Sequence, residues 1–253
     1  MDTETRVRYH LLDGIRGIVL ISMIVYHCSW NLVYIYGVKW PWYHGTGAYV
    51  WQQSICWTFI LLSGFCWSMG RQHIKRGLLV FGGGLLVTAV TIAVMPQKRV
   101  VFGVLTCIGS CMLLMIPLEK LLRKLPAEAG LAAGIALFAL TRNINRGFLG
   151  FESWNLVALP SNLYRNLLTA YIGMPQGAFF STDYFSLIPW FFLFMIGYFL
   201  YRIFRKTSWL DGAIFGKRIP FFDWLGKHSL LVYLLHQPIL YVVLELLNGL
   251  GII

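Results

Sequence analysis

Residues 12–27 read LDGIRGIVLISMIVYH, a stretch that is almost wholly apolar yet carries ionisable groups near both ends. Asp13 and Arg16 lie near its start, His27 closes it, and the ten residues between Arg16 and His27 are apolar or small. A helix of this composition suits the hydrocarbon core of a bilayer, which is about 30 Å thick. The stretch therefore predicts a membrane-spanning helix that carries a histidine into the membrane.

The whole chain shares this apolar character. Of its 253 residues, 58% are hydrophobic and only 12% are charged, whereas soluble domains are nearer one quarter charged. The mean hydropathy is +0.66, and a soluble domain of this size cannot bury so much apolar surface. The composition predicts an all-α, polytopic membrane helix bundle. The net charge of +11 comes from short basic clusters between apolar segments, with no nucleic-acid-binding motif among them.

Seven segments are apolar and long enough to be interpreted as spanning helices, which need about 20 residues each. These segments are residues 11–36, 47–70, 75–95, 101–118, 128–142, 184–204 and 226–249. Residues 163–180 include Arg165 and Pro175, so they predict a re-entrant or interfacial helix instead. Residues 1–253 are expected to form a single integral-membrane domain.

The basic residues predict the orientation of the bundle. With a cytoplasmic N-terminus, 15 of the 21 basic residues fall inside and only six fall outside, as the positive-inside rule requires. The six are Lys39, Lys98, Arg99, Arg142, Arg146 and Arg165. Asp2 and Glu4 dilute the positive charge that a signal peptide would carry, so the first apolar segment is expected to be retained.

The histidines of the first and last segments are predicted to lie at similar depths. Arg16 and His27 are eleven residues apart, which is three helical turns plus about 20°, so they share a face about 16 Å apart. His236 follows Ser229 by seven residues, again on nearly the same face and about 10 Å deeper. Ionisable residues in membranes usually face a bundle interior or a water-filled cavity. The two histidines therefore predict a shared polar cavity, with Lys227 and Ser229 at its inner end.

Buried histidines fit three classes of membrane protein. In an enzyme they take part in the reaction, and in a small-solute or proton-coupled transporter they relay protons or bind the solute. In a scaffold they only fix how the helices pack. The sequence has no inverted repeat and few spans, which disfavours the transporter. The five cysteines lie in or beside apolar segments, and their spacing predicts neither a disulfide framework nor a metal site.

Five blocks of the sequence together resemble a known family. They are RYHLLDGIRGIVLISMIVYH, FILLSGFCWSMGR, RVVFGVLTCIG, DYFSLIPWFFLFMIGY and LGKHSLLVYLLHQPIL, in this order along the chain. The set resembles the catalytic-domain family of heparan-α-glucosaminide N-acetyltransferase in its small bacterial form. The spacing of Arg16 and His27 also matches the Arg-x10-His pattern of the wider transmembrane acyltransferases.

The resemblance implies an acyl-CoA-dependent transmembrane O- or N-acyltransferase. It would move an acetyl or other acyl group from cytosolic acyl-CoA to a sugar amine or hydroxyl of a glycan or glycolipid at the far side, without a metal. The expected location is the bacterial inner membrane, and the expected partners are lipids, acyl-CoA and the acceptor. A homodimer is also among the expected partners, because dimers are common among membrane enzymes. The identity of the acceptor does not follow from the resemblance.

The resemblance also indicates which histidines are candidate catalytic residues. The lysosomal enzyme of the family has an asparagine where this chain has His27, and its proposed active histidine falls in the following loop, where His44 lies. Either histidine is thus a candidate base, His236 is a third, and both direct transfer and an acyl-histidine intermediate stay open.

Binding roles are predicted for residues at the two ends of the bundle. Arg16 is the first candidate for the CoA phosphates, with Asp13 holding it, and Lys227 and Ser229 follow. On the outer side, an aromatic loop and the segment before the sixth span are expected to hold the sugar. Their candidate residues are Trp42, Asp183 and Tyr184.

Overall fold

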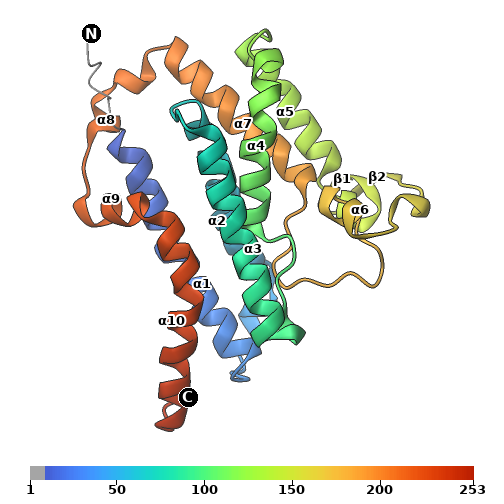
Figure 1. The fold of residues 1–253 in the computed structure, drawn as a ribbon, viewed down its shortest axis with the longest axis vertical. Coiled ribbons are helices and arrows are strands. Elements are labelled where there is room, and N and C mark those ends of the chain that lie inside the picture. The colour runs from blue at the N-terminus through green and yellow to red at the C-terminus, as the bar shows by residue number, and fades with distance from the viewer. Residues whose placement is uncertain (1–8) are drawn as a thin grey trace. The chain divides into compact units, whose positions relative to one another are not determined.

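The computed structural model describes residues 9–253 (Figure 1). Its α-helices are α1 (His10–Tyr34), α2 (Thr46–Trp67), α3 (His73–Val94), α4 (Val104–Leu122), α5 (Ala127–Thr141), α6 (Leu167–Ile172), α7 (Leu187–Lys206), α8 (Ala213–Gly216), α9 (Pro220–Lys227) and α10 (Ser229–Gly249). Two strands, β1 (Phe148–Phe151) and β2 (Trp154–Ala158), pair in antiparallel fashion. Asp2 and Glu4 lie outside the described residues, and so do Arg6 and Arg8, two of the 15 basic residues predicted to lie inside.

Each of the seven segments predicted to span the membrane contains an α-helix. Within residues 9–253, five helices are long and apolar enough to cross a bilayer, namely α1, α3, α4, α7 and α10. The chain is therefore a multi-pass integral membrane protein built as a helix bundle. Helix α5 has 15 residues, about 22 Å of helix, so a full count of seven spans stays a prediction, as does the cytoplasmic N-terminus.

The structure adds details that the sequence pattern did not predict. The β1–β2 hairpin lies between α5 and α6, and its β1 residue Gly150 has a positive φ that favours glycine. Within the predicted helix at 163–180, only the six residues of α6 are α-helical, too few to span a bilayer. Asn166 begins α6 because its side chain accepts hydrogen bonds from the backbone N–H groups of Leu168 and Thr169, both at 3.0 Å.

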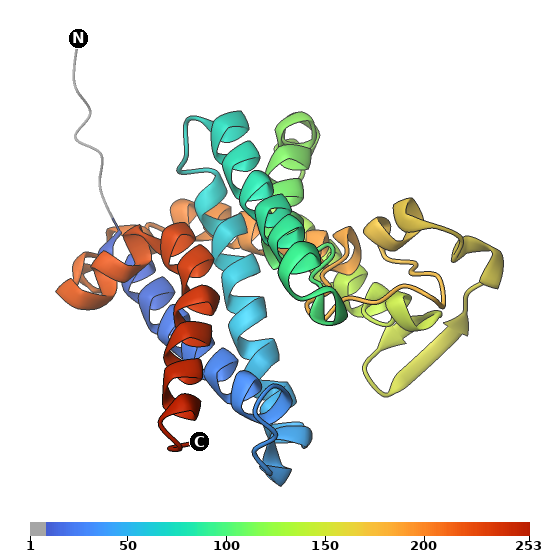
Figure 2. The same ribbon diagram turned by 60° about the horizontal axis from the view of Figure 1, so that its bottom comes forward.

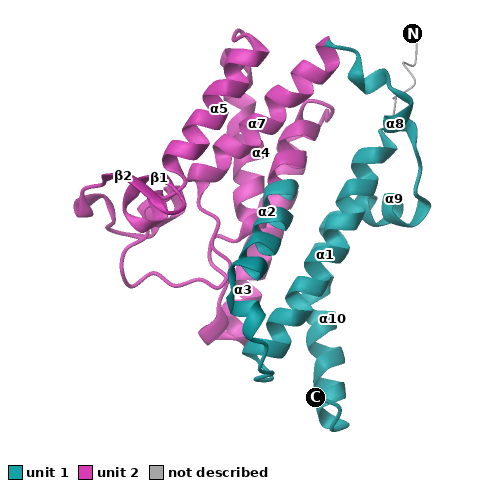
Figure 3. Cartoon of the chain, turned by 180° about the vertical axis from the view of Figure 1, so that it is seen from behind, with its two compact units in different colours: residues 1–59, 207–253 teal, residues 60–206 magenta. Residues whose placement is uncertain are grey.

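The chain divides into two compact units (Figure 3). Unit 1 comprises residues 1–59 and 207–253, and unit 2 comprises residues 60–206, so the boundary falls within α2. Unit 1 thus contains α1 and α10, the two helices that carry His27 and His236. Unit 2 contains α3, α4, α5, α7 and the hairpin.

In unit 1, α1 packs against both α9 and α10, and the three helices lie side by side in Figures 1 and 2. The contact with α9 joins backbone to backbone. A Cβ atom at Gly17 would collide with the carbonyl of Phe222, and one at Gly226 would collide with the carbonyl of Asp13. Small residues allow such close helix packing in membranes. Helix α10 makes up most of the last predicted segment, residues 226–249, and only His228 separates it from the end of α9.

In unit 2, α3 and α4 also meet through glycine. A Cβ at Gly84 of α3 would lie 2.5 Å from the backbone nitrogen of Thr106, and one at Gly109 of α4 would lie 2.5 Å from that of Phe81. Arg202 of α7 donates hydrogen bonds to the carbonyls of Leu122 and of the residue that follows it, at 3.0 and 3.2 Å. These bonds satisfy carbonyl groups that the end of α4 would otherwise leave unpaired.

Candidate functional site

The two intramembrane histidines meet between α1 and α10. The ring centroids of His27 and His236 are 4.9 Å apart, with their planes tilted by 52°. His27 lies on α1 and His236 lies on α10. Only 6% of the surface of His236 is exposed. The structure thus brings together the two residues on which the sequence analysis based its polar cavity.

Two amide side chains complete this cluster. Asn31 lies four residues after His27 on α1, is 2% exposed, and donates from Nδ2 to Oε1 of Gln237 at 3.1 Å. The Nε2 of Gln237 lies 3.0 Å from Nδ1 of His27. We name these four residues, His27, Asn31, His236 and Gln237, the histidine–amide cluster. It joins two helices that are more than 200 residues apart in the sequence.

One buried nitrogen of the cluster has no partner within the described chain. The Nδ1 of His236 contacts the carbonyl of Tyr233, whereas its Nε2 is buried without a hydrogen bond. Leaving a buried polar atom unpaired costs roughly 1–3 kcal/mol, and such atoms are uncommon in folded proteins. An unpaired imidazole nitrogen of this kind is suited to a reacting group that occupies the site transiently.

An aromatic group extends from His27 toward the loop after α1. Tyr26 meets the ring of His27 at 5.8 Å and that of Trp51 at 5.2 Å, and Trp42 stacks on Trp51 at 6.1 Å. Trp42, a predicted acceptor contact, is therefore linked to the cluster through two rings. His44 instead lies exposed in the 3-10 turn Pro41–His44, where its Nδ1 is 3.2 Å from the hydroxyl of Tyr34.

The predicted donor-binding residues lie at the start of α1 and around the α9–α10 junction. Arg16 donates to Asp13 at 3.2 Å, which confirms the pairing expected from their spacing. Lys227 is exposed at the end of α9, and Ser229 begins α10. These residues bring positive charge to one end of unit 1.

A second buried network at this end was missed by the sequence analysis. Nδ1 of His10 lies 2.9 Å from Oδ2 of Asp223, and Arg218 donates from Nε to Nε2 of the same ring at 3.0 Å. His10 stands close to basic residues in the sequence, which is typical of a solvated side chain, but it is buried in the structure. Its partners are more than 200 residues away, so no local pattern could have indicated them.

Asp183 and Tyr184 belong to unit 2, in the segment before α7. Oδ2 of Asp183 accepts a hydrogen bond from the backbone N–H of Val104 at 3.3 Å, and burial raises the pKa of this carboxyl to about 6. Tyr184 donates its hydroxyl to the carbonyl of Ala170 and packs its ring 4.9 Å from that of Phe179.

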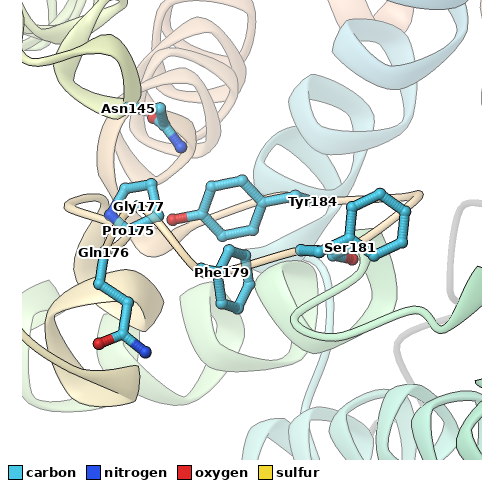
Figure 4. A pocket seen from close by; sticks show the side chains of 8 residues that line it. Asn145, Pro175, Gln176, Gly177, Phe179, Ser181 and Tyr184 are labelled. Carbon is cyan, nitrogen blue, oxygen red and sulfur yellow. The ribbon is translucent and has the colours of Figure 1, made fainter. Parts of the chain in front are cut away.

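Tyr184 also lines a cavity of about 330 Å³ in unit 2 (Figure 4). The other lining residues are Asn145, Pro175, Gln176, Gly177, Phe179, Phe180 and Ser181. The lining contains aromatic rings, amides and a hydroxyl and carries no formal charge. Such a surface is suited to a neutral, polar ligand with an apolar face. Within residues 9–253, no group of three or more His, Cys, Asp or Glu side chains is placed to hold a metal ion.

Asn31 and Gln237 were not among the predicted site residues, although a signal for them exists. Each is an amide within an otherwise apolar helix, and each lies next to a candidate histidine, either one turn away or adjacent in sequence. Polar residues in membrane helices commonly hydrogen-bond between helices. This rule could have paired the two amides, but not their specific atoms.

Comparison with known proteins assigns the chain to a family. The family model described as heparan-alpha-glucosaminide N-acetyltransferase, catalytic, matches residues 8–238, a range that includes the whole histidine–amide cluster. No curated protein and no solved structure gives a significant match. The chain belongs to the heparan-α-glucosaminide N-acetyltransferase catalytic family, and this membership implies a transmembrane acetyltransferase.

Proposed function

We propose that the protein transfers an acetyl or other acyl group from cytosolic acyl-CoA to an amine or hydroxyl of a sugar at the far side of the membrane. The family supplies the reaction class. The observation that carries the site assignment is the pair of imidazoles between α1 and α10, 4.9 Å apart, one of which has a buried and unpaired nitrogen.

The chemistry needs a base for the nucleophile and a stabilising contact for the oxyanion. An imidazole takes the proton of the attacking hydroxyl or amine while a new C–O or C–N bond forms at the thioester carbonyl. The tetrahedral intermediate then collapses, the C–S bond breaks, and the CoA thiolate receives the proton from the imidazolium. The contact between the rings of His236 and His27 supports these two residues as the groups that do this, whereas His44 is exposed on a loop turn.

The donor is proposed to bind at the basic end of unit 1. The guanidinium of Arg16 carries five N–H donors and suits bidentate recognition of phosphate, and Asp13 orients it. Lys227 adds a second cation, and Ser229 adds a hydroxyl. The acyl arm would then extend along α1 and α10 toward the histidines.

The acceptor is proposed to be a sugar held by aromatic and amide groups. Trp42 is one such group, since it is exposed and linked by stacked rings to His27. In unit 2, the cavity beside Tyr184 is a separate candidate sugar site, because its rings offer apolar faces and the amides of Asn145 and Gln176 offer hydrogen bonds to hydroxyls. Its volume of about 330 Å³ is at the small end of the range for ligand pockets.

Donor binding tests the proposal without knowledge of the acceptor. A non-hydrolysable acetyl-CoA analogue should bind saturably to the full chain in detergent, and Arg16→Ala should weaken this binding at least tenfold. Absence of binding at millimolar analogue would contradict the proposal. It would favour a transporter that uses the histidines as relay groups.

Transfer is tested in proteoliposomes with [14C]acetyl-CoA and glucosamine as the acceptor probe. The expected result is release of free CoA with label on the sugar, lost in His27→Gln and His236→Gln. His228→Gln is the matched control, because His228 is an exposed histidine next to α10. Full activity in both site variants, with loss in His44→Gln, would move the base to the loop.

A further inference from the structure

Gln237 follows His236 in the sequence, but the two side chains meet His27 in different ways. Successive residues of a helix point about 100° apart, so one packs beside the ring while the other reaches its edge. The His236 ring lies 4.9 Å from the His27 ring, and the amide of Gln237 lies 3.0 Å from its Nδ1. The amide thus contacts a titratable atom of a proposed catalytic residue.

Asn31 determines which end of the Gln237 amide faces His27. An amide nitrogen only donates hydrogen bonds and an amide oxygen only accepts them. Nδ2 of Asn31 donates to Oε1 of Gln237 at 3.1 Å, which leaves the NH₂ group of Gln237 facing the imidazole. Asn31 is 2% exposed, so the donor side of this bond is shielded from water.

The tautomer of His27 follows from this contact. Because Gln237 donates to Nδ1, a neutral His27 must carry its proton on Nε2. His27 therefore presents an N–H donor at the far end of its ring.

His236 has the opposite tautomer. Its Nδ1 faces the carbonyl of Tyr233, which can only accept, so the proton of a neutral His236 lies on Nδ1. Its Nε2 then holds a lone pair, and this is the nitrogen that is buried without a partner in the described chain. One ring of the pair thus offers a donor and the other an acceptor.

From this arrangement we infer a division of roles between the two histidines. Nε2 of His236 takes the proton of the attacking hydroxyl or amine, and the Nε2–H of His27 donates a hydrogen bond to the oxyanion that forms at the thioester carbonyl. His236 later returns the proton to the CoA thiolate, while His27 keeps its own proton throughout. Gln237 and Asn31 are positioning residues that act through His27. This inference rests on the proposed acyl transfer and favours direct transfer over an acyl-His27 intermediate.

The tautomers are tested independently of activity by ¹⁵N NMR. The full chain, labelled at its six histidines, is measured in detergent above neutral pH, where protonated and bare ring nitrogens have well-separated chemical shifts. Signals are assigned from their loss in His27→Gln and His236→Gln. We expect a bare Nδ1 on His27 and a bare Nε2 on His236. A proton on Nδ1 of His27 would overturn the inference and leave the proposed acyl transfer standing.

Gln237→Glu tests the positioning role, because a carboxylate accepts hydrogen bonds and cannot donate to Nδ1. We expect the His27 proton to move to Nδ1 in the NMR spectrum. We also expect kcat to fall about 10²–10³-fold, as when one oxyanion donor is removed, with an unchanged KM for acetyl-CoA. The matched control is Gln97→Glu, the same substitution at an exposed residue between α3 and α4.

A third variant separates positioning from packing. Gln237→Met keeps a similar volume but makes no hydrogen bond, so His27 should show a mixture of tautomers and a smaller loss of kcat than Gln237→Glu. Equal losses in both variants with the His27 tautomer unmoved would show that Gln237 only fills space. If the wild type transfers no acyl group at all, the proposed function fails instead, whatever the NMR result.

Discussion

Two pairs of neighbouring apolar helices, α3–α4 and α1–α10, are held together by different means. In the first pair, Gly84 and Gly109 let the backbones come so close that an added methyl group would collide. In the second pair, side chains with ionisable or amide groups bridge the helices, as His27 and Gln237 do. Both are established ways to join helices in lipid. We assign the proposed chemistry to α1–α10, because the side chains that bridge this pair include two imidazoles.

The largest expected effect is on catalysis at α1–α10. His236→Gln should lower the rate of acyl transfer by about 10²–10⁴-fold, the usual contribution of a general base. The thermal midpoint in detergent should stay near that of the wild type. Acyl-CoA consumption and thermal unfolding are measured on the same preparation. Loss of the folded protein in this variant would contradict a purely chemical role for His236.

The next effect is on stability at α3–α4. Gly84→Ala should lower the free energy of unfolding by about 1–3 kcal/mol, because the new methyl group meets the backbone of Thr106. Activity per folded molecule should be unchanged. Gly82→Ala is the matched control on the same helix, since its methyl group would enter open space. There alanine should stabilise the helix by up to about 1 kcal/mol, and equal losses in both variants would refute the close-packing argument.

A smaller effect is the pH dependence of folding stability that arises from the Asp183 carboxyl. The pKa of this carboxyl rises from 3.8 to about 6 in the folded chain, so the folded state holds its proton more tightly than the unfolded state. Stability should therefore fall as pH rises from about 4 to about 6. Asp183→Asn should remove this slope and raise stability at pH 7 by about 1–2 kcal/mol. Thermal midpoints across pH 4–7 measure it, and an unchanged slope would contradict the assignment.

The smallest effect lies on the same helix pair as the histidines, beyond the end of α1. The hydroxyl of Tyr36 donates to Glu245 of α10 at 2.9 Å, near the surface. Tyr36→Phe should change the free energy of unfolding by no more than about 0.5 kcal/mol and leave acyl transfer intact. A loss of transfer comparable with that of Gln237→Glu would show that the whole contact between α1 and α10, and not the histidine–amide cluster, governs the rate.

The sequence alone predicted the positions of the long helices well, because hydropathy is a local property. Each of the seven apolar segments contains a helix, and the pairing of Asp13 with Arg16 follows from their spacing of three residues. The β1–β2 hairpin was missed because its strands are four and five residues long. The short helix α9 was not predicted because its eight residues, Pro220–Lys227, lie almost wholly before the last apolar segment.

The candidate site was predictable only in part. Histidines inside apolar segments stand out in the sequence, and their depth follows from helix geometry. The contacts of Asn31 with Gln237 and of His10 with Asp223 join residues more than 200 positions apart. A single sequence shows periodicity along each helix but not which faces of distant helices meet. The tautomers depend on those contacts, so they required the structure.

The close backbone contact between α1 and α9 also sets how many residues separate this contact from the two histidines. Gly17 and Gly226 mark the contact, and His27 and His236 each lie ten residues beyond one of these glycines. On α1 the ten residues from Gly17 to His27 are all helical and rise about 15 Å, and one residue more would turn the His27 ring by about 100°. The path from Gly226 to His236 instead crosses the junction of α9 and α10 at His228. The contact at Gly17 therefore fixes the position of the His27 ring along α1. A single residue inserted between Gly17 and His27 would turn this ring away from His236.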